Sequence, residues 1–137
     1  MLSAIDTNVI SALWSYENVP INIAQLLAKY KSEGGLIVSG PVYAELLAYP
    51  NTSVEYLDKF LEATGIEVDY YLKKSVWEMA GKAYSDYAIR RRKARGGQTK
   101  RILADFVIGA HALVSTDRLI TLDKNRYNTS FPELNLV

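Results

Sequence analysis

Short apolar runs alternate along the chain with longer segments in which apolar positions recur every three to four residues. The short runs are typical of buried strands in a parallel sheet, and the longer segments are typical of amphipathic helices. The expected strands are Leu2–Asp6, Leu36–Ser39, Ile66–Asp69 and Leu119–Leu122, and a last one is expected at 134–137.

The helices expected between these strands have proline or a capping residue near their starts and glycine or proline at their ends. This alternation predicts an α/β fold with three layers, in which helices cover both faces of a parallel sheet of about five strands. It also predicts one domain over residues 1–137. The expected helices are 7–14, a segment from Pro20 to Gly34-Gly35, 40–50, a segment from Thr52 or Ser53 to Gly65, about 72–93 with Gly96-Gly97 as its stop, and 103–114.

The composition narrows the chemistry that the chain can carry. Its 137 residues suit one compact domain with a sizeable core. The absence of cysteine excludes disulfides and thiolate metal sites, and His111 is the only histidine. Any metal must therefore be held by oxygen ligands, which favours magnesium or manganese. No apolar stretch is long enough to cross a bilayer and the start lacks the features of a signal peptide, so a cytoplasmic protein is expected.

The net charge of +1 hides an uneven distribution of charge. No acid lies between Asp86 and Asp105, whereas seven basic residues do, which leaves nine basic residues against 15 acids elsewhere. A basic segment on an otherwise acidic body is typical of a surface that binds a polyanion, although a solvated helix end would look the same. The basic residues are Arg90, Arg91, Arg92, Lys93, Arg95, Lys100 and Arg101.

Four acids stand as lone charges at the ends of apolar elements: Asp6, Glu45, Asp105 and Asp123. In a parallel sheet, ligands bind beyond the carboxyl ends of the strands, where these positions can meet. Two carboxylates about 4 Å apart repel by roughly 4 kcal/mol at an effective dielectric near 20. A divalent ion would replace this repulsion by coordination, so the pattern predicts a metal-dependent hydrolase with these four acids as catalytic and metal-binding residues.

Neighbouring polar residues can assist such a site. Thr121 is two residues before Asp123 on the same strand, so the two side chains should face the same way, with Thr121 orienting a carboxylate or a water. Thr7 and Asn8 could do the same or could simply cap a helix. The helical spacing of Tyr84 and Tyr87 favours core packing over base stacking.

Each acid also has a simpler structural explanation when it is taken alone. His111 is interpreted as a core residue and not as a ligand, and Asp117, which precedes a strand, competes with Asp123 for the fourth acidic position. The simpler explanations are an N-cap for Asp6, a solvent-facing helix position for Glu45, a helix-start acid for Asp105 and a turn residue for Asp123.

Taken in order, four segments resemble the PIN-domain family and, within it, the VapC-type toxin ribonucleases. The resemblance covers essentially the whole chain. The segment before Asp105 is more apolar than is common in the family, and the stretch after Asp123 matches the family's ending only loosely. The segments are Asp6-Thr7-Asn8, Val42-Tyr43-Ala44-Glu45-Leu46, Ala104-Asp105-Phe106-Val107-Ile108-Gly109-Ala110-His111-Ala112 and Leu119-Ile120-Thr121-Leu122-Asp123.

The resemblance implies a PIN-like sheet of about five strands between helices, in a nuclease domain over residues 1–137. It implies RNA cleavage with Mg²⁺, or Mn²⁺ as a substitute, held by Asp6, Glu45, Asp105 and Asp123. It further implies a homodimer that is neutralised by a small antitoxin protein, as in a type II toxin-antitoxin system. The basic segment before Asp105 would then hold RNA phosphates. The residues expected to do so are Arg90, Arg91, Arg92, Arg95, Lys100 and Arg101.

Two other functions fit the same residues. One is a PIN-type nuclease that acts in RNA maturation or on structured DNA. The other is a non-catalytic nucleic-acid-binding module in which the acids cap helices or hold a structural ion. A phosphatase or receiver domain of the haloacid type is disfavoured, because Asn8 stands where a second aspartate is needed.

Overall fold

The core of the protein is a parallel sheet of four strands in the order β3-β2-β1-β4. The computed structural model describes residues 1–15, 20–95 and 100–137. Because every pairing is parallel, the carboxyl ends of all four strands lie at one edge of the sheet. The strands are β1 (Ser3–Ile5), β2 (Leu36–Ser39), β3 (Ile66–Asp69) and β4 (Arg118–Ile120).

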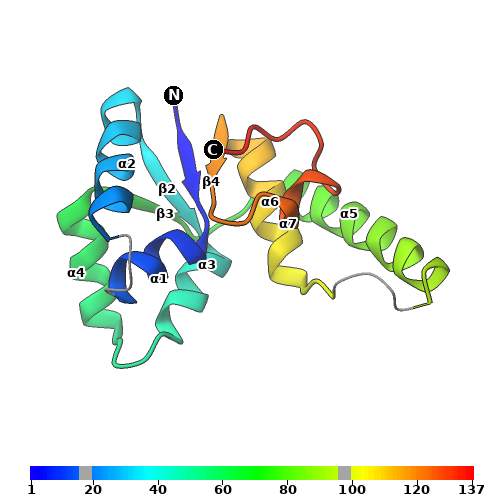
Figure 1. The fold of residues 1–137 in the computed structure, drawn as a ribbon, viewed down its shortest axis with the longest axis horizontal. Helices are drawn as coiled ribbons and strands as arrows, with labels where there is room; N and C mark the ends of the chain where they lie inside the picture. The colour runs from blue at the N-terminus through cyan, green and yellow to red at the C-terminus, as the bar shows by residue number, and fades with distance from the viewer. Residues whose placement is uncertain (16–19, 96–99) are drawn as a thin grey trace.

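Helices cover both faces of this sheet, as Figure 1 shows. One side carries α1, α2 and α4, and the other carries α5, α6 and α7. Helix α3 directly follows β2 and contacts α1, α4 and α6. The helices are α1 (Thr7–Ser15), α2 (Pro20–Glu33), α3 (Gly40–Leu47), α4 (Val54–Thr64), α5 (Lys74–Lys93), α6 (Leu103–Ser115) and α7 (Asn125–Asn128).

Local sequence explains where several helices begin and end. The Ser53 hydroxyl accepts a hydrogen bond of 3.1 Å from the Tyr56 N–H and so caps α4. Gly65 ends the same helix with φ of 70°, a left-handed conformation that glycine adopts without strain. Pro41 occupies a first-turn position of α3, where its missing N–H costs nothing.

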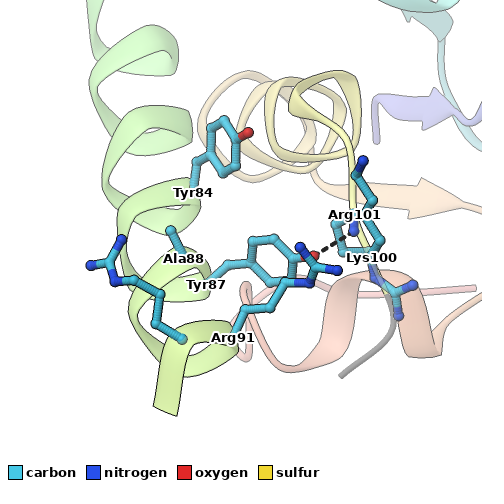
Figure 2. Close-up of a pocket in the computed structure, with 7 residues that line it drawn as sticks. Tyr84, Tyr87, Ala88, Arg91, Lys100 and Arg101 are labelled. Carbon is cyan, nitrogen blue, oxygen red and sulfur yellow. Dashed lines mark hydrogen bonds between the residues drawn. The ribbon is translucent and has the colours of Figure 1, made fainter. Parts of the chain in front are cut away.

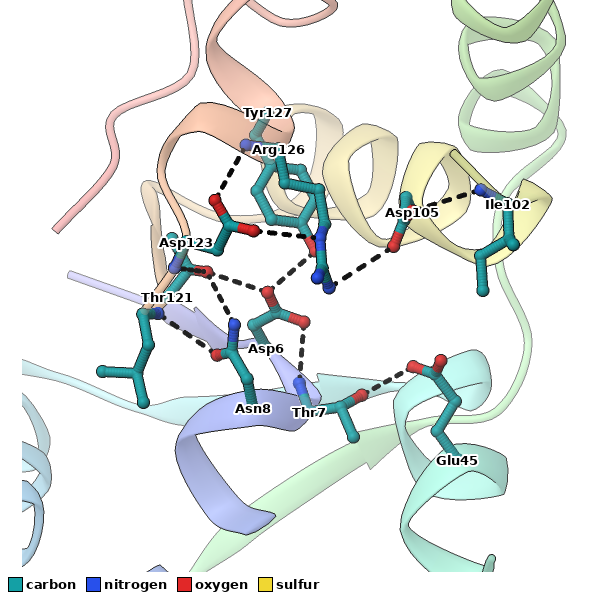
Figure 3. Close-up of polar contacts among 11 residues, drawn as sticks. Asp6, Thr7, Asn8, Glu45, Ile102, Asp105, Thr121, Asp123, Arg126 and Tyr127 are labelled. Atoms are coloured by element: carbon teal, nitrogen blue, oxygen red, sulfur yellow. Dashed lines mark hydrogen bonds and ion pairs between the residues drawn. The ribbon is translucent and has the colours of Figure 1, made fainter. Parts of the chain in front are cut away.

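Helix α6 is the most deeply buried helix described. Every residue from Asp105 to Ala112 is buried, which follows from its almost continuous apolar sequence. It packs along α5 and also contacts β1 and β4. The buried middle of α6 places its first turn, with Asp105, beside the carboxyl edge of the sheet (Figure 3).

The predicted α/β fold with a parallel sheet between helices is confirmed, with differences in detail. The last expected strand forms a single bridge between Leu136 and Leu119, so the sheet has four strands instead of about five. Helix α5 begins at Lys74 instead of about Leu72, and the short helix α7 was not expected. The predicted stop at Gly96-Gly97 lies outside the described residues. In the described part of the chain, no helix has the length and apolar character needed to cross a membrane.

Candidate active site

Two polar residues leave neighbouring strands side by side at the carboxyl edge of the sheet. Asp6 follows the end of β1 and Thr121 follows the end of β4, and these strands pair as Ile5 with Ile120. The backbone N–H of Asp6 donates to the Ile120 carbonyl over 3.0 Å, so the two chains remain paired up to this point. Asp6 is only 1% exposed, so this acid is buried at the carboxyl edge of the sheet.

Three neutral donors hold the Asp6 carboxylate (Figure 3). The hydroxyls of Thr121 and Tyr127 each donate to Oδ2 over 2.8 Å, and the Thr7 N–H donates to Oδ1 over 2.8 Å. Burial nevertheless raises the pKa of Asp6 above its ordinary value, against the opposing effect of these donors and of Arg126. Burial also raises the pKa of Tyr127, so its hydroxyl keeps the proton that it donates.

The Thr121 hydroxyl joins Asp6 to the segment that follows β4. While it donates to Asp6, it accepts from the Asp123 N–H over 3.1 Å and from Asn8 Nδ2 over 3.4 Å. Asn8 Oδ1 in turn accepts from the Leu122 N–H over 3.2 Å. Thr121 and Asn8 therefore orient the site through side-chain bonds, and Asn8 does not act as a helix cap.

Asp105 and Asp123 approach this network from α6 and from the loop before α7. Asp105 is buried, and its Oδ2 accepts from the Ile102 N–H over 3.2 Å at the start of α6. Its Oδ1 lies 3.7 Å from Arg126 Nη1, while Asp123 Oδ2 lies 3.5 Å from Arg126 Nε. Burial disfavours the charge of Arg126, but the surrounding acids raise its pKa, so the guanidinium stays charged between two carboxylates.

Glu45 lies at the margin of this group, on α3. Its Oε1 accepts from the Thr7 hydroxyl over 2.6 Å, which leaves Thr7 as the link between Glu45 and Asp6. The Thr7 side chain therefore contacts an acid and does not cap α1. Asp6, Asp105 and Asp123 surround Arg126, and Glu45 joins them through one intervening residue (Figure 3).

Asp117 and His111 lie away from this group. Asp117 Oδ2 accepts from the Leu2 N–H over 2.6 Å, beside the amino end of β1 and so at the opposite edge of the sheet. His111 is buried, and its Nε2 lies 3.2 Å from Asp69 Oδ2 at the end of β3. Burial lowers the pKa of His111, with a partial offset from Asp69, as expected for a histidine in the core.

The candidate metal ligands at the carboxyl edge are of the chemical type that a hard divalent cation prefers. All of them are oxygens of carboxylates or hydroxyls, which are the ligands that magnesium and manganese prefer. Asp6 is a buried carboxylate with only neutral hydrogen-bond donors, so a nearby cation would stabilise its charged form. As arranged here, no three acidic or histidine side chains of the described residues lie close enough together to hold one ion.

A basic pocket of about 370 Å³ lies between α5 and the segment that leads into α6 (Figure 2). Four of its lining residues are cations and none is an acid. The Arg101 N–H donates to the Tyr87 hydroxyl over 2.6 Å, and the next residue, Ile102, contacts Asp105. The consecutive residues Arg101 and Ile102 therefore connect the pocket to the acidic group. Its lining residues are Tyr84, Tyr87, Ala88, Arg91, Arg92, Lys100 and Arg101.

The pocket contains four of the six residues expected to contact nucleic acid. Arg90 instead lies 3.4 Å from the Ser130 hydroxyl through Nη2, and neither Arg90 nor Arg95 lines the pocket. Tyr87 is buried as predicted, while Tyr84 stacks on Phe106 at 5.1 Å between ring centroids and remains 38% exposed. Core packing therefore accounts for Tyr87 fully and for Tyr84 in part.

Sequence reasoning missed Arg126 and Tyr127 as members of the site. Both lie on α7, a helix of four residues that is too short to show a helical period. The signal that could have found them is the large aromatic Tyr127 within an otherwise polar stretch, since a buried tyrosine hydroxyl normally has a partner.

Comparison with known proteins agrees with this architecture. The structure resembles that of VapBC2 from Rickettsia felis bound to a DNA fragment from its promoter, with a TM-score of 0.69, 22% identity, and coverage of 100% of this chain and 98% of that chain. It also resembles VapBC-1 from nontypeable Haemophilus influenzae, with a TM-score of 0.66, 23% identity, and coverage of 100% and 97%. No curated protein matches the sequence. The family model of the PIN domain matches residues 4–132, so the chain belongs to the PIN-domain family.

Proposed function

We propose that this protein is a divalent-metal-dependent endoribonuclease that hydrolyses RNA phosphodiester bonds. The observation that carries the proposal is the gathering of Asp6, Asp105 and Asp123 at one edge of the sheet, beside a pocket lined by cations. PIN domains are generally nucleases, which supports hydrolysis of a phosphodiester. A role in helix capping alone would not explain why Asp123 and Asp105 both lie around one guanidinium next to buried Asp6.

The acids would hold Mg²⁺, with Mn²⁺ as a substitute. Asp6, Asp105 and Asp123 would be the main ligands, and Glu45 would contribute from α3. When bound, such an ion supplies positive charge that stabilises the charge developing on the phosphate oxygens and makes water a better nucleophile. Oxygen ligands without histidine or cysteine support magnesium over zinc.

The neutral side chains around Asp6 would keep the acids in place for this reaction. Thr121 and Tyr127 fix the direction of the Asp6 carboxylate, and Asn8 fixes the path of the chain from Thr121 to Asp123. Because the bonds made by Thr121 and Tyr127 involve buried or half-buried groups, they limit the movement of the carboxylates. We assign Thr121 a positioning role for Asp6 and Asp123.

The basic pocket would bind the RNA backbone next to the cleavage position. No ion pair within the described residues neutralises its four cations, and the buried Nε of Arg91 has no hydrogen-bond partner there. Unpaired guanidinium and ammonium groups are suited to phosphate oxygens. Arg90 and Arg95 would contribute through their positive charge from outside the pocket.

We further propose that the protein is the toxin of a type II toxin-antitoxin pair, that it forms a homodimer, and that a small antitoxin neutralises it. The similarity in fold to one chain of each VapBC structure, over 98% and 97% of that chain, supports this role. If the pair exists, expression of this chain alone should arrest growth. Co-expression of the small antitoxin encoded beside it should relieve the arrest. Harmless expression together with intact RNA cleavage would instead favour a role in RNA maturation.

Cleavage of total RNA in Mn²⁺ tests the enzymatic proposal. The wild-type protein should cleave RNA, whereas Asp6→Asn should fold but fail to cleave it, and excess chelator should stop the wild type. Matched single-stranded and structured DNA substrates serve as comparisons, and they should be cleaved poorly. Undiminished cleavage by Asp6→Asn, or by wild type in chelator, would show that these acids do not perform the reaction.

A further inference from the structure

Arg126 lies where the acidic side chains converge. Its guanidinium is 3.7 Å from Asp105 through Nη1 and 3.5 Å from Asp123 through Nε (Figure 3). Its backbone N–H also donates to Asp123 Oδ1 over 3.3 Å. One arginine therefore contacts two of the acids proposed to hold the metal, and the charge of Asp6 acts on it as well.

Arg126 is the only full positive charge that these acids contact within the described residues. Asp6 receives bonds only from two hydroxyls and a backbone N–H, and the one cation in ion-pair contact with Asp105 or Asp123 is Arg126. Two carboxylates that contact one guanidinium, with the charge of Asp6 acting on the same group, remain short of positive charge. A divalent cation in the same place would neutralise them more completely.

The contacts of Arg126 are loose enough to be replaced. Both ion pairs exceed the roughly 2.7–2.9 Å of a tight charge-assisted hydrogen bond. The Arg126 side chain is 35% exposed, and ion pairs at such positions add little stability. Its backbone is held independently, because neighbouring Tyr127 is fully buried and bonds to Asp6. The guanidinium can therefore move away while α7 stays in place.

We propose that Arg126 is a resident counter-ion of the acidic site, which a divalent cation must displace in order to bind. This inference rests on the proposed metal-dependent function. The two cations compete for the same carboxylates, so each weakens the binding of the other by the same factor. The concentration of metal needed to load the protein is then set partly by a residue of the chain itself.

Calorimetric titration with Mn²⁺, in the absence of RNA, tests this inference. The proteins compared are wild type, Arg126→Gln and, as a control, Lys124→Gln, which removes the same charge from an exposed residue without an ion pair to these acids. Arg126→Gln should bind Mn²⁺ about tenfold more tightly than wild type, within the usual range for coupled ligands. Lys124→Gln should stay within about twofold of wild type, because exposed charges are screened.

A second measurement follows the side chain itself. In wild type, the NMR signal of the Arg126 Nε–H group should shift as Mg²⁺ saturates the site, because its carboxylate neighbours are lost. Arg126→Met, which keeps most of the aliphatic stem, serves if Gln disturbs α7, and it should also bind Mn²⁺ more tightly.

The outcomes separate this inference from the proposed function. Wild type that binds Mn²⁺ with an affinity unchanged by both Arg126 substitutions would overturn the counter-ion role while leaving the metal-dependent nuclease intact. Equal tightening in Lys124→Gln would overturn it too, since only overall charge would matter. Absence of Mn²⁺ binding in wild type and in both Arg126 variants would overturn the inference and the metal dependence together.

Discussion

The acidic edge of the sheet and the basic pocket beside it are built in opposite ways. At the acidic edge, the Asp6 carboxylate is buried and accepts hydrogen bonds from Thr7, Thr121 and Tyr127. In the pocket, Arg91, Arg92 and Lys100 line an open cavity without an acid among its walls. The first arrangement fixes the position of charged groups, and the second leaves charged groups available to a ligand.

Under the proposed function, this difference predicts separate roles for the two regions, with reaction at the acidic edge and RNA binding in the pocket. Carboxylates that perform chemistry must be held in direction, because small displacements cost reaction rate. Cations that bind a flexible polyanion need accessibility more than fixed direction. Substitutions at the acidic edge should therefore lower the rate of cleavage or the stability, and substitutions in the pocket should lower affinity for RNA.

The largest effect is expected from removing one charge at the acidic edge. Asp105→Asn keeps an acceptor oxygen for the Ile102 N–H, so α6 should still begin normally. Loss of the carboxylate should lower the rate of RNA cleavage by about 100-fold or more. Single-turnover assays measure this, with Asp117→Asn as the control, since Asp117 bonds Leu2 at the opposite edge. Equal losses in both variants would place the effect in folding and not in chemistry.

A smaller effect on stability is expected from Tyr127→Phe. The substitution removes the hydroxyl that donates to buried Asp6 and should lower the free energy of unfolding by about 1–3 kcal/mol. Urea unfolding checks this against Tyr43→Phe, whose hydroxyl donates to Asp58 at an exposed position where water can replace the bond. If the two variants lose the same stability, the bond from Tyr127 to Asp6 contributes no more to the free energy of unfolding than a surface contact does.

In the pocket, the double substitution Arg91→Gln and Lys100→Gln should weaken RNA binding by about tenfold. The slope of log affinity against log salt concentration should fall by the amount expected for the loss of roughly two phosphate contacts. Fluorescence anisotropy with a short RNA measures this in the Asp6→Asn background, which prevents cleavage. The control exchanges Lys59 and Lys74, exposed residues outside the pocket, for Gln. Equal weakening by the control pair would mean that RNA senses net charge alone.

The smallest effect is a pH dependence of stability. Burial raises the pKa of Asp6 in the folded protein above 3.8, the ordinary pKa that Asp6 has in the unfolded chain. The folded state therefore binds a proton at Asp6 more tightly than the unfolded state does. Wild type should lose stability as pH rises from 3.8 through the higher folded pKa, and Asp6→Asn should lack this loss. Without metal, the stability of Asp6→Asn relative to wild type should therefore increase from acid to neutral pH in denaturant titrations. A constant difference would contradict the raised pKa.

Much of the fold follows from local patterns in the sequence. Apolar runs placed the four strands within a residue or two, and the continuous apolar sequence of α6 predicted its burial. The predicted last strand pairs with β4 only through a single bridge between Leu136 and Leu119. The strand order depends on long-range packing, which no local pattern encodes.

The sequence indicated which acids would gather at the candidate site, but it did not indicate their neutral and basic partners. Asp6, Asp105 and Asp123 stand out because each is a lone charge at the end of an apolar element. Arg126 and Tyr127 belong to a polar stretch of the sequence. They reach the acids only because α7 folds back over the end of β1. Tyr127 bonds to Asp6, which is 121 positions away, and spacing along the chain cannot reveal such a contact.

Single-turnover cleavage measured against RNA concentration, in Mn²⁺, tests the division between the two regions most directly. It compares wild type, Asp6→Asn and the pocket variant with Arg91→Gln and Lys100→Gln. Asp6→Asn should fail to cleave at every RNA concentration, whereas the pocket variant should need more RNA but approach the wild-type rate at saturation. Wild-type cleavage by Asp6→Asn, or a pocket variant whose rate stays low at saturating RNA, would contradict the account.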